Sequence, residues 1–378
     1  MNLDALKSQV KDFTPELDAR GRCEAPEPGI YRMDFPTYKA IEGAVNANAI
    51  KQGVPENGTP RHMHADLNHA MEKRDTDALR NGRRLHTLVL EPELAERWVS
   101  MPQAPKSTKD GLAKWVDAIE QLVGEHITEL HEVVGTPPSA FRDLQGWVSN
   151  AYETALRITG SDIVPEEQRA MLDEQAKALR THELCGRYLA ADGLSEVTVI
   201  WDKTMKVRDY TTPNGFVEKT LRMKARLDRL VMHAGKVYSI DIKTAANGGL
   251  AAFTSAACNN GYDIAAAHYR EAVGFITGQH KSEPRLLVCE NRNGLYTASV
   301  KVFGDRWLDA ADARRMQVLR LYASCLHIGK MPGHGWEWAT DGTIGRYTAE
   351  VMEPPYWMIE NLDKNEEQES RDEMEDAA

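Results

Sequence analysis

The sequence has few cysteines and no long apolar run. Five cysteines are scattered over 378 residues, and none forms a Cys-x-x-Cys pair or a cluster with histidine. Such an odd, dispersed set excludes a disulfide framework and a four-thiolate zinc or iron–sulfur site. No stretch approaches the roughly 18 apolar residues of a membrane span, and the first residues lack the apolar core of a secretory signal. We therefore expect a cytoplasmic protein with no membrane partner.

Positive charge is scarce overall but locally concentrated. The chain has 46 basic and 57 acidic side chains, for a net charge of −11, and nine of those acids lie in residues 360–378 beside two bases. Residues 201–229 instead hold eight bases and four acids. Because local potential steers binding, this basic strip is compatible with a polyanionic ligand such as a nucleic acid.

The hydrophobic fraction of 42% and mean hydropathy of −0.50 indicate a chain that buries a large core. Its composition and periodicity change along the sequence, and these changes divide it into segments. We expect a flexible N-terminal arm with one short helix at 1–28, a single domain at 29–358 and an acidic disordered tail at 359–378. Within the domain we expect a helical part at 29–190, a sheet core at 194–302, and a C-terminal helix and packing segment at 303–358.

Periodicity places the main elements. Leu79, Gly82, His86 and Val89 form one stripe at helical spacing, and Pro92 follows it. Other helices are expected at 108–133, 165–190, 262–278 and 305–328. Strands are expected at 196–201, 221–232, 236–244, 285–290 and 295–302. This order predicts a mixed α/β or α+β fold with an N-terminal helical elaboration.

The two strands at 221–232 and 236–244 are expected to form a hairpin. A loop at 233–236 would pair Met232 with Val237, and would thereby place Asp228 directly opposite Asp241. Alternation then gathers five charged residues on the hairpin: Lys224, Arg226, Asp228, Asp241 and Lys243. Opposed side chains have β-carbons about 4.5–5.5 Å apart, where two like charges destabilise a sheet. A divalent cation would remove that repulsion.

Two converging carboxylates with a nearby lysine suit metal-dependent phosphodiester hydrolysis. Hard oxygen ligands hold Mg²⁺ or Mn²⁺, and a lysine can orient a water or stabilise developing charge. The same residues would also suit a surface hairpin whose Asp241–Lys243 and Asp228–Arg226 side chains pair in solvent. The pattern alone leaves both interpretations open.

Four segments, two of them in the hairpin, bear on this choice: GRRLHTLVLEP (82–92), LSEVTVIW (194–201), MKARLDRL (223–230) and SIDIKTAA (239–246). In order and context they resemble the motifs of the PD-(D/E)xK nuclease superfamily. With GIYRMDFPTYKAI (29–41), they are similar to its exonuclease VIII (RecE-type) branch over roughly residues 29–300. The resemblance implies a restriction-endonuclease-like core in which helices flank a central mixed sheet.

The resemblance also implies roles for individual residues. The implied Mg²⁺ or Mn²⁺ ligands are His86, Asp228, Asp241 and the backbone carbonyl of Ile242. The implied catalytic residues are Asp228, Asp241, Lys243 and Glu196. Expected DNA contacts, which combine the resemblance with the basic strip, are Lys224, Arg226, Arg222 and Tyr269. Without the resemblance, the pattern would also be consistent with His86 as a buried core histidine and with Glu196 as an exposed residue at the edge of the sheet. Ala265 departs from the family, which often has a glutamine four residues before the tyrosine.

The implied activity is a Mg²⁺-dependent exodeoxyribonuclease on linear double-stranded DNA. The family further implies 5′-to-3′ degradation that leaves a 3′ single strand for a single-strand annealing protein, and a tetrameric ring around DNA ends. Two other functions remain open: a catalytically silent DNA-binding or scaffold module of the same fold, and a structure-selective endonuclease. Closed circular DNA distinguishes the last, because an exonuclease needs an end.

Overall fold

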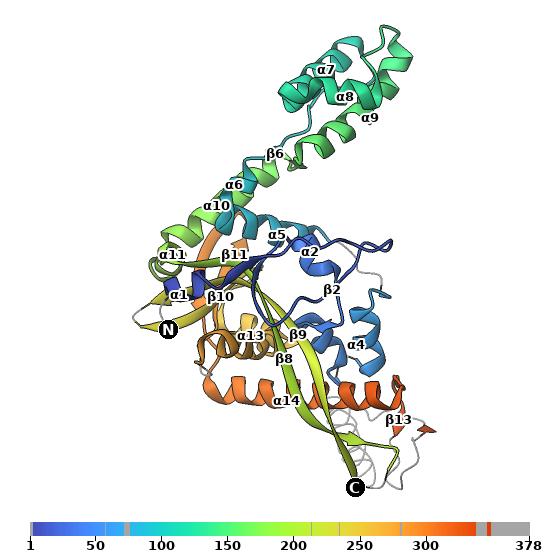
Figure 1. The fold of residues 1–378 in the computed structure, drawn as a ribbon. Helices are drawn as coiled ribbons and strands as arrows, with labels where there is room; N and C mark the ends of the chain where they lie inside the picture. Colours follow the sequence, from blue (N-terminus) through green and yellow to red (C-terminus); the bar gives the residue numbers. More distant parts are fainter. Residues whose placement is uncertain are drawn as a thin grey trace, which may run out of the picture.

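The structure is a computed structural model that describes residues 3–56, 58–71, 76–212, 214–233, 235–279, 282–337 and 346–348. It is a mixed α/β fold in which helices flank a central mixed sheet, as the sequence predicts (Figure 1). The predicted acidic tail and most of the packing segment after residue 337 lie outside the described residues. No helix in the described part is long and apolar enough to cross a membrane.

The central sheet has eight strands, in the order β1-β3-β8-β9-β10-β11-β12, with β5 paired to β9. Three neighbouring pairs are parallel, namely β1 with β3, β5 with β9 and β10 with β11, and the others are antiparallel. The strands are β1 Val10–Asp12, β3 Gly29–Arg32, β5 Ala44–Val45, β8 Gly193–Asp209, β9 Gly215–His233, β10 Lys236–Ala245, β11 Arg285–Arg292 and β12 Leu295–Lys301. Two-stranded ladders are also formed by β2 Cys23–Glu24 with β4 Ile41–Glu42, β6 Trp98–Val99 with β7 Asp162–Ile163, and β13 Trp336–Glu337 with β14 Arg346–Tyr347.

The β9–β10 hairpin has the predicted register, with Met232 opposite Val237. Its loop is shorter than predicted, because His233 pairs with Lys236 and only residues 234–235 remain between the strands. The ladder ends at Arg229 opposite Ile240, one pair before the two aspartates.

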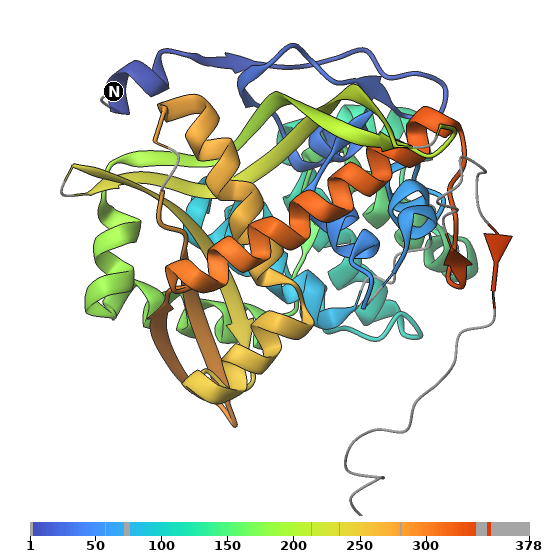
Figure 2. The same ribbon diagram turned by 90° about the horizontal axis from the view of Figure 1, so that it is seen from below.

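Helices cover both faces of the sheet. On one face, α13 Tyr262–Thr277 and α14 Asp305–Ile328 pack on β8 and β9, and Figure 2 shows α14 running across this face. On the other face, α5 Asp77–Leu90, α10 Glu166–Thr181 and α11 Glu183–Ala190 enclose a second apolar cluster with β10 and β11. The remaining helices of the body are α2 Phe35–Ala40, α3 Ala47–Gly53, α4 Pro60–Leu67, α6 Pro92–Ala95 and α12 Leu250–Asn259.

A helical lobe extends away from the sheet (Figure 1). It consists of α7 Lys109–Val123, the short 3-10 helix Gly124–His126, α8 Ile127–Val134 and α9 Phe141–Thr159, and its own buried cluster includes Leu112, Trp115 and Val148. The helix expected at 108–133 is interrupted at Gly124, which has a φ of 48°. The expected single domain thus contains a separate apolar core within this lobe.

Residues 3–12 are more closely joined to the body than a flexible arm would be, and this corrects that part of the prediction. Helix α1, Leu3–Lys7, buries Leu6 in the main core, and β1 adds a strand to the sheet. Val10 packs against the same core, and Lys7 forms an ion pair with Asp192 at 2.6 Å. Apolar burial at Leu6 and Val10 therefore fixes a segment whose overall polarity suggested a loose arm.

Candidate active site

The candidate site lies where β8 and β9 lose their regular alternation. Leu194 and Val197 are three residues apart, yet both contribute to the same buried cluster, although a regular strand would place them on opposite faces. Between them, Glu196 has a φ of 51°, in the left-handed region that is uncommon for residues other than glycine. Ladder pairing skips Glu196 and Asp228, which lie opposite each other. This irregularity lets both carboxylates project together, and such backbone strain clusters at functional sites.

His86 joins these carboxylates from α5. Its Nδ1 lies 3.4 Å from Asp228 Oδ2 and 4.0 Å from Glu196 Oε1, and its Nε2 lies 2.9 Å from the Ile242 carbonyl oxygen. Because a carbonyl only accepts, Nε2 carries the proton, which leaves Nδ1 of the neutral ring as the possible metal ligand. The backbone N–H of Ile242 in turn donates to Asp228 Oδ2 at 2.9 Å.

Asp241 and Lys243 form the other half of the cluster. The Lys243 ammonium donates to Asp241 Oδ1 at 2.7 Å, and Asp241 is close enough to Asp228 for each carboxyl group to influence the pKa of the other. Burial alone would raise the pKa of Asp241, but the Lys243 ammonium outweighs it, so the pKa lies below its ordinary value. Burial would lower the pKa of Lys243, but the two carboxylates hold it above its ordinary value. Asp241 is therefore ionised and Lys243 protonated near neutral pH.

Asp228 behaves in the opposite way. Its side chain is 12% exposed, and burial, reinforced by the nearby carboxylates of Asp241 and Glu196, raises its pKa to about 7. Several carboxylates this close together cannot all be ionised without repelling one another. Binding of a divalent cation would reduce this repulsion, as binding of a proton does.

The donor set fits a hard divalent cation. Among the described residues, His86, Glu196 and Asp228 each offer one ligand atom, and these atoms lie within 4.8 Å of one another. The Asp241 carboxylate adjoins Asp228. Carboxylate oxygens with one imidazole nitrogen suit Mg²⁺ or Mn²⁺, and the cluster has no thiolate that would favour a softer metal. Of the four expected ligands, His86 and Asp228 belong to this group, and Glu196 joins them in place of Asp241. The carbonyl of Ile242, the fourth expected ligand, accepts a hydrogen bond from His86 instead.

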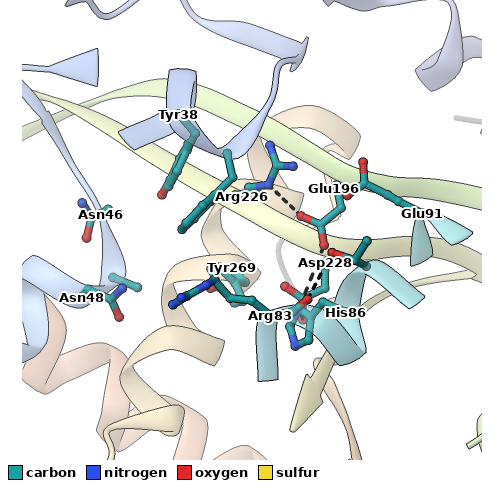
Figure 3. Close-up of a pocket in the computed structure, with 13 residues that line it drawn as sticks. Tyr38, Asn46, Asn48, Arg83, His86, Glu91, Glu196, Arg226, Asp228 and Tyr269 are labelled. Carbon is teal, nitrogen blue, oxygen red and sulfur yellow. Dashed lines mark hydrogen bonds and ion pairs between the residues drawn. The ribbon is translucent and has the colours of Figure 1, made fainter. Parts of the chain in front are cut away.

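A cavity of about 310 Å³ opens beside the cluster (Figure 3). Its walls include His86, Glu196 and Asp228 on one side and Tyr269 from α13 on another, and burial raises the pKa of the Tyr269 phenol far above neutrality. The other lining residues are Phe35, Tyr38, Asn46, Ala47, Asn48, Arg83, Thr87, Glu91 and Arg226. Tyr269, which was expected to contact DNA, thus lines the cavity.

The three basic residues predicted to contact DNA are placed differently from one another. Arg226 reaches the cavity, where its guanidinium pairs with Glu196 at 2.7 Å and donates to the Met33 carbonyl at 2.6 Å. Arg222 does not line the cavity, and its guanidinium pairs with Asp202 at 2.5 Å.

The structure contradicts the prediction that Lys224 contacts DNA. It is only 3% exposed, and its ammonium donates to the carbonyls of Ile41 at 2.7 Å and Tyr38 at 3.1 Å. The chain at residues 38–41 covers this part of β9. Lys224 is therefore a structural lysine that satisfies backbone acceptors and not a phosphate contact.

Lys51 is a site residue that the sequence analysis missed. It follows the cavity-lining Asn48 by almost one turn of α3, and its ammonium lies 5.7 Å from the centre of the Tyr262 ring, which Lys243 also approaches, at 5.3 Å. Burial, with the nearby charge of Lys243, lowers its pKa to about 8. No ion pair of Lys51 occurs within the described ranges. The spacing of Asn48 and Lys51 on one helical face is the signal that could have indicated it.

Comparisons with known proteins give little more. No protein-family model and no curated protein matches the chain. Among solved structures, a protein from Eubacterium rectale named "Putative exonuclease" is 12% identical, with a TM-score of 0.42 over 80% of this chain and 89% of that one. The structure of SSO0001 is also 12% identical, with a TM-score of 0.18 over 65% of this chain and 94% of that one. Similarities this distant show neither the family nor the function of the chain.

Proposed function

We propose that this chain is a divalent-metal-dependent DNA exonuclease of the PD-(D/E)xK type. The observation that carries the proposal is the convergence of Asp228, Asp241 and Lys243 with His86 and Glu196, a cluster of which Asp228, His86 and Glu196 line one cavity. These residues come from four separate elements, α5, β8, β9 and β10. A surface hairpin whose charges pair in solvent would not need a buried carboxylate with a pKa near 7 or a histidine from another element.

The site residues have different roles in the proposed hydrolysis. Asp228, Asp241 and Glu196, with Nδ1 of His86, would hold Mg²⁺ or Mn²⁺, and the carbonyl of Ile242 orients the imidazole. When bound, the ion polarises the scissile phosphate and lowers the pKa of a water. Lys243 stays protonated and stabilises the negative charge that develops on the phosphate. Lys51, which does not line the cavity, supplies a second ammonium near Lys243.

The cavity supports action at a DNA end. Its volume of about 310 Å³ is at the lower limit of small-ligand pockets and cannot enclose an unbroken double helix. Aromatic and amide side chains line it opposite the carboxylates, and such groups suit a nucleotide separated from its partner strand. A terminal nucleotide is therefore the proposed occupant.

We include in the proposal the finer properties of the exonuclease VIII branch, which the resemblance of the motifs implies. These are 5′-to-3′ polarity, production of a 3′ single strand for an annealing protein, and assembly of a tetrameric ring. The site residues described above support the hydrolytic chemistry, whereas these three properties rest on the resemblance alone. Polarity, the single-stranded product and the oligomeric state are each tested by a separate measurement.

End-labelled DNA tests the proposal. Linear duplex labelled at the 5′ or the 3′ end is incubated with Mg²⁺ and wild-type protein, Lys243→Ala, or the control Lys114→Ala, which changes an exposed lysine on the helical lobe. We expect early release of 5′-labelled mononucleotide by the wild type and the control, and none by Lys243→Ala. Cleavage of closed circles would identify an endonuclease instead. DNA binding without cleavage in Mg²⁺ or Mn²⁺ would identify a silent binding module.

A further inference from the structure

A second hollow lies far from the candidate active site. It has a volume of about 410 Å³ and is formed by the end of the β8–β9 hairpin and by α14, two elements in contact. Its lining residues are Lys206, Val207, Arg208, Tyr210, Phe216, Gln317, Arg320, Leu321 and Ser324. None of them lines the catalytic cavity. Phe216 and Asp228 are twelve residues apart on β9, which corresponds to about 40 Å at the rise of an extended strand.

This hairpin groove is strongly basic. Lys206, Arg208 and Arg320 all line it, and within the described ranges none of the three forms an ion pair with a carboxylate. The buried Nε of Arg208 also has no hydrogen-bond partner there. Glu218 lies across the β8–β9 ladder from Lys206, so the three cations share this face with one nearby carboxylate, and the remaining positive charge favours an anionic ligand.

The groove also presents an aromatic ring to solvent. Phe216 is 53% exposed, and the ammonium of Lys206 and the guanidinium of Arg208 lie 4.9 Å and 5.8 Å from its ring centre. A second ring, that of Tyr210, lies 5.9 Å from the same guanidinium. Both cations lie over the Phe216 ring, which is still half exposed. Proteins that hold unpaired bases combine such rings with cations, because a base stacks on a ring while its phosphates meet positive charge.

We propose that the hairpin groove binds a single-stranded nucleic-acid segment. Phe216 stacks on a base, and Lys206, Arg208 and Arg320 contact the adjacent phosphates. A duplex is disfavoured as the ligand because its bases are already stacked and paired, which leaves no base face for Phe216. The inference goes beyond the proposed nuclease activity and does not depend on it, since the groove shares no residue with the catalytic cavity.

Binding in the absence of metal tests the groove separately from catalysis. The full chain is titrated in EDTA with fluorescent oligo(dT) of about 12 nucleotides, within the range of known single-strand sites, and with a duplex of equal length. Fluorescence anisotropy is compared for the wild type, Phe216→Ala, Phe216→Tyr, Arg320→Ala and Arg306→Ala. The last is a matched control, because Arg306 is an exposed arginine at the opposite end of α14.

We expect Phe216→Ala to weaken oligo(dT) binding by about 5-fold or more and Phe216→Tyr to retain it, because stacking needs only a ring. Arg320→Ala should reduce the slope of log affinity against log salt by about 0.7, the share of one phosphate contact with a single strand. Arg306→Ala should match the wild type. Because Phe216 is exposed, its replacement should leave the circular dichroism spectrum unchanged.

Three results would overturn the proposal. The first is equal affinity of wild type and Phe216→Ala for oligo(dT). The second is a loss of affinity in Arg306→Ala as large as in Arg320→Ala, which would indicate general electrostatic attraction. The third is a change in sedimentation on replacing Phe216, which would make the groove an interface between copies of the chain. None of these results would bear on the nuclease assay.

Discussion

The carboxylate of Asp228 accepts a hydrogen bond from the backbone N–H of Ile242, at 2.9 Å. The carbonyl of the same Ile242 accepts one from His86 Nε2, also at 2.9 Å. The β9–β10 ladder has ended at Ile240, so side chains replace the neighbouring strand as partners of these backbone groups. The end of the ladder therefore fixes the positions of both a carboxylate and an imidazole in the candidate active site.

Lys243 should contribute to chemistry more than to metal binding. In Lys243→Ala we expect kcat to fall by about 10²- to 10³-fold, the usual loss when one group that stabilises transition-state charge is removed. Mn²⁺ affinity should be retained, because the change releases Asp241 from its ion pair at 2.7 Å. Steady-state kinetics with Mn²⁺ and calorimetric titration separate the two quantities. Equal losses in kcat and in Mn²⁺ affinity would contradict this role.

Lys51 should act through its charge. Lys51→Met keeps much of the side-chain length but removes the ammonium near Lys243, and we expect reduced cleavage with unchanged Mn²⁺ binding. Lys51→Arg should retain more activity than Lys51→Met. The comparison is made at a pH below 8, where the wild-type ammonium is protonated. Identical cleavage rates for Lys51→Met and wild type would remove Lys51 from the site.

Asp228 should make the metal-free protein less stable as pH rises. Its pKa is about 7 in the folded chain and 3.8 ordinarily, so between these values the folded state binds more protons than the unfolded state. This contribution is complete below about pH 3.8 and is lost as pH rises through about 7, with a slope of at most about 1.4 kcal/mol per pH unit. Asp228→Asn removes it.

Urea unfolding in EDTA between pH 5 and pH 8 measures this effect as the difference between wild type and Asp228→Asn. The variant should gain stability relative to the wild type as pH rises, and Mn²⁺ should restore the wild type preferentially at the higher pH. A difference that does not change with pH would show that Asp228 titrates normally.

Lys224 should affect folding and not DNA affinity. Lys224→Met leaves the carbonyls of Ile41 and Tyr38 without their ammonium donor, and each unsatisfied buried polar group costs about 1–3 kcal/mol. We expect a lower urea midpoint with an unchanged KM for DNA. Arg208→Met is the comparison variant, because Arg208 lies in the hairpin groove and is proposed to contact phosphates there. A raised KM with unchanged stability in Lys224→Met would restore the original assignment of a phosphate contact.

The sequence predicted the parts of the structure that depend on short-range rules. Period-two alternation and a tight turn determined the β9–β10 register, and the helix at 305–328 was predicted with the bounds of α14. The convergence of His86 with Asp228 came from the resemblance of the motifs, because no local rule connects a helix to a strand more than 140 residues later.

Departures from regularity could not be predicted. Alternation assumes an unbroken strand, whereas Glu196 takes a left-handed conformation and brings Leu194 and Val197 to the same face. The alternation of residues along a strand also does not show which other segment covers its face. The sequence analysis therefore missed the burial of Lys224 under residues 38–41 and the position of Lys51 near Lys243. Both result from contacts between residues distant in the sequence.

Metal-dependent cleavage tests the central claim most directly. Linear duplex DNA is incubated with wild-type protein or Asp241→Asn in EDTA, Mg²⁺ or Mn²⁺, and release of mononucleotides is followed. The account predicts no release in EDTA, rapid release by the wild type with either metal, and a loss of at least about 10²-fold in Asp241→Asn. Release that persists in EDTA, or that Asp241→Asn carries out at the wild-type rate, would contradict it.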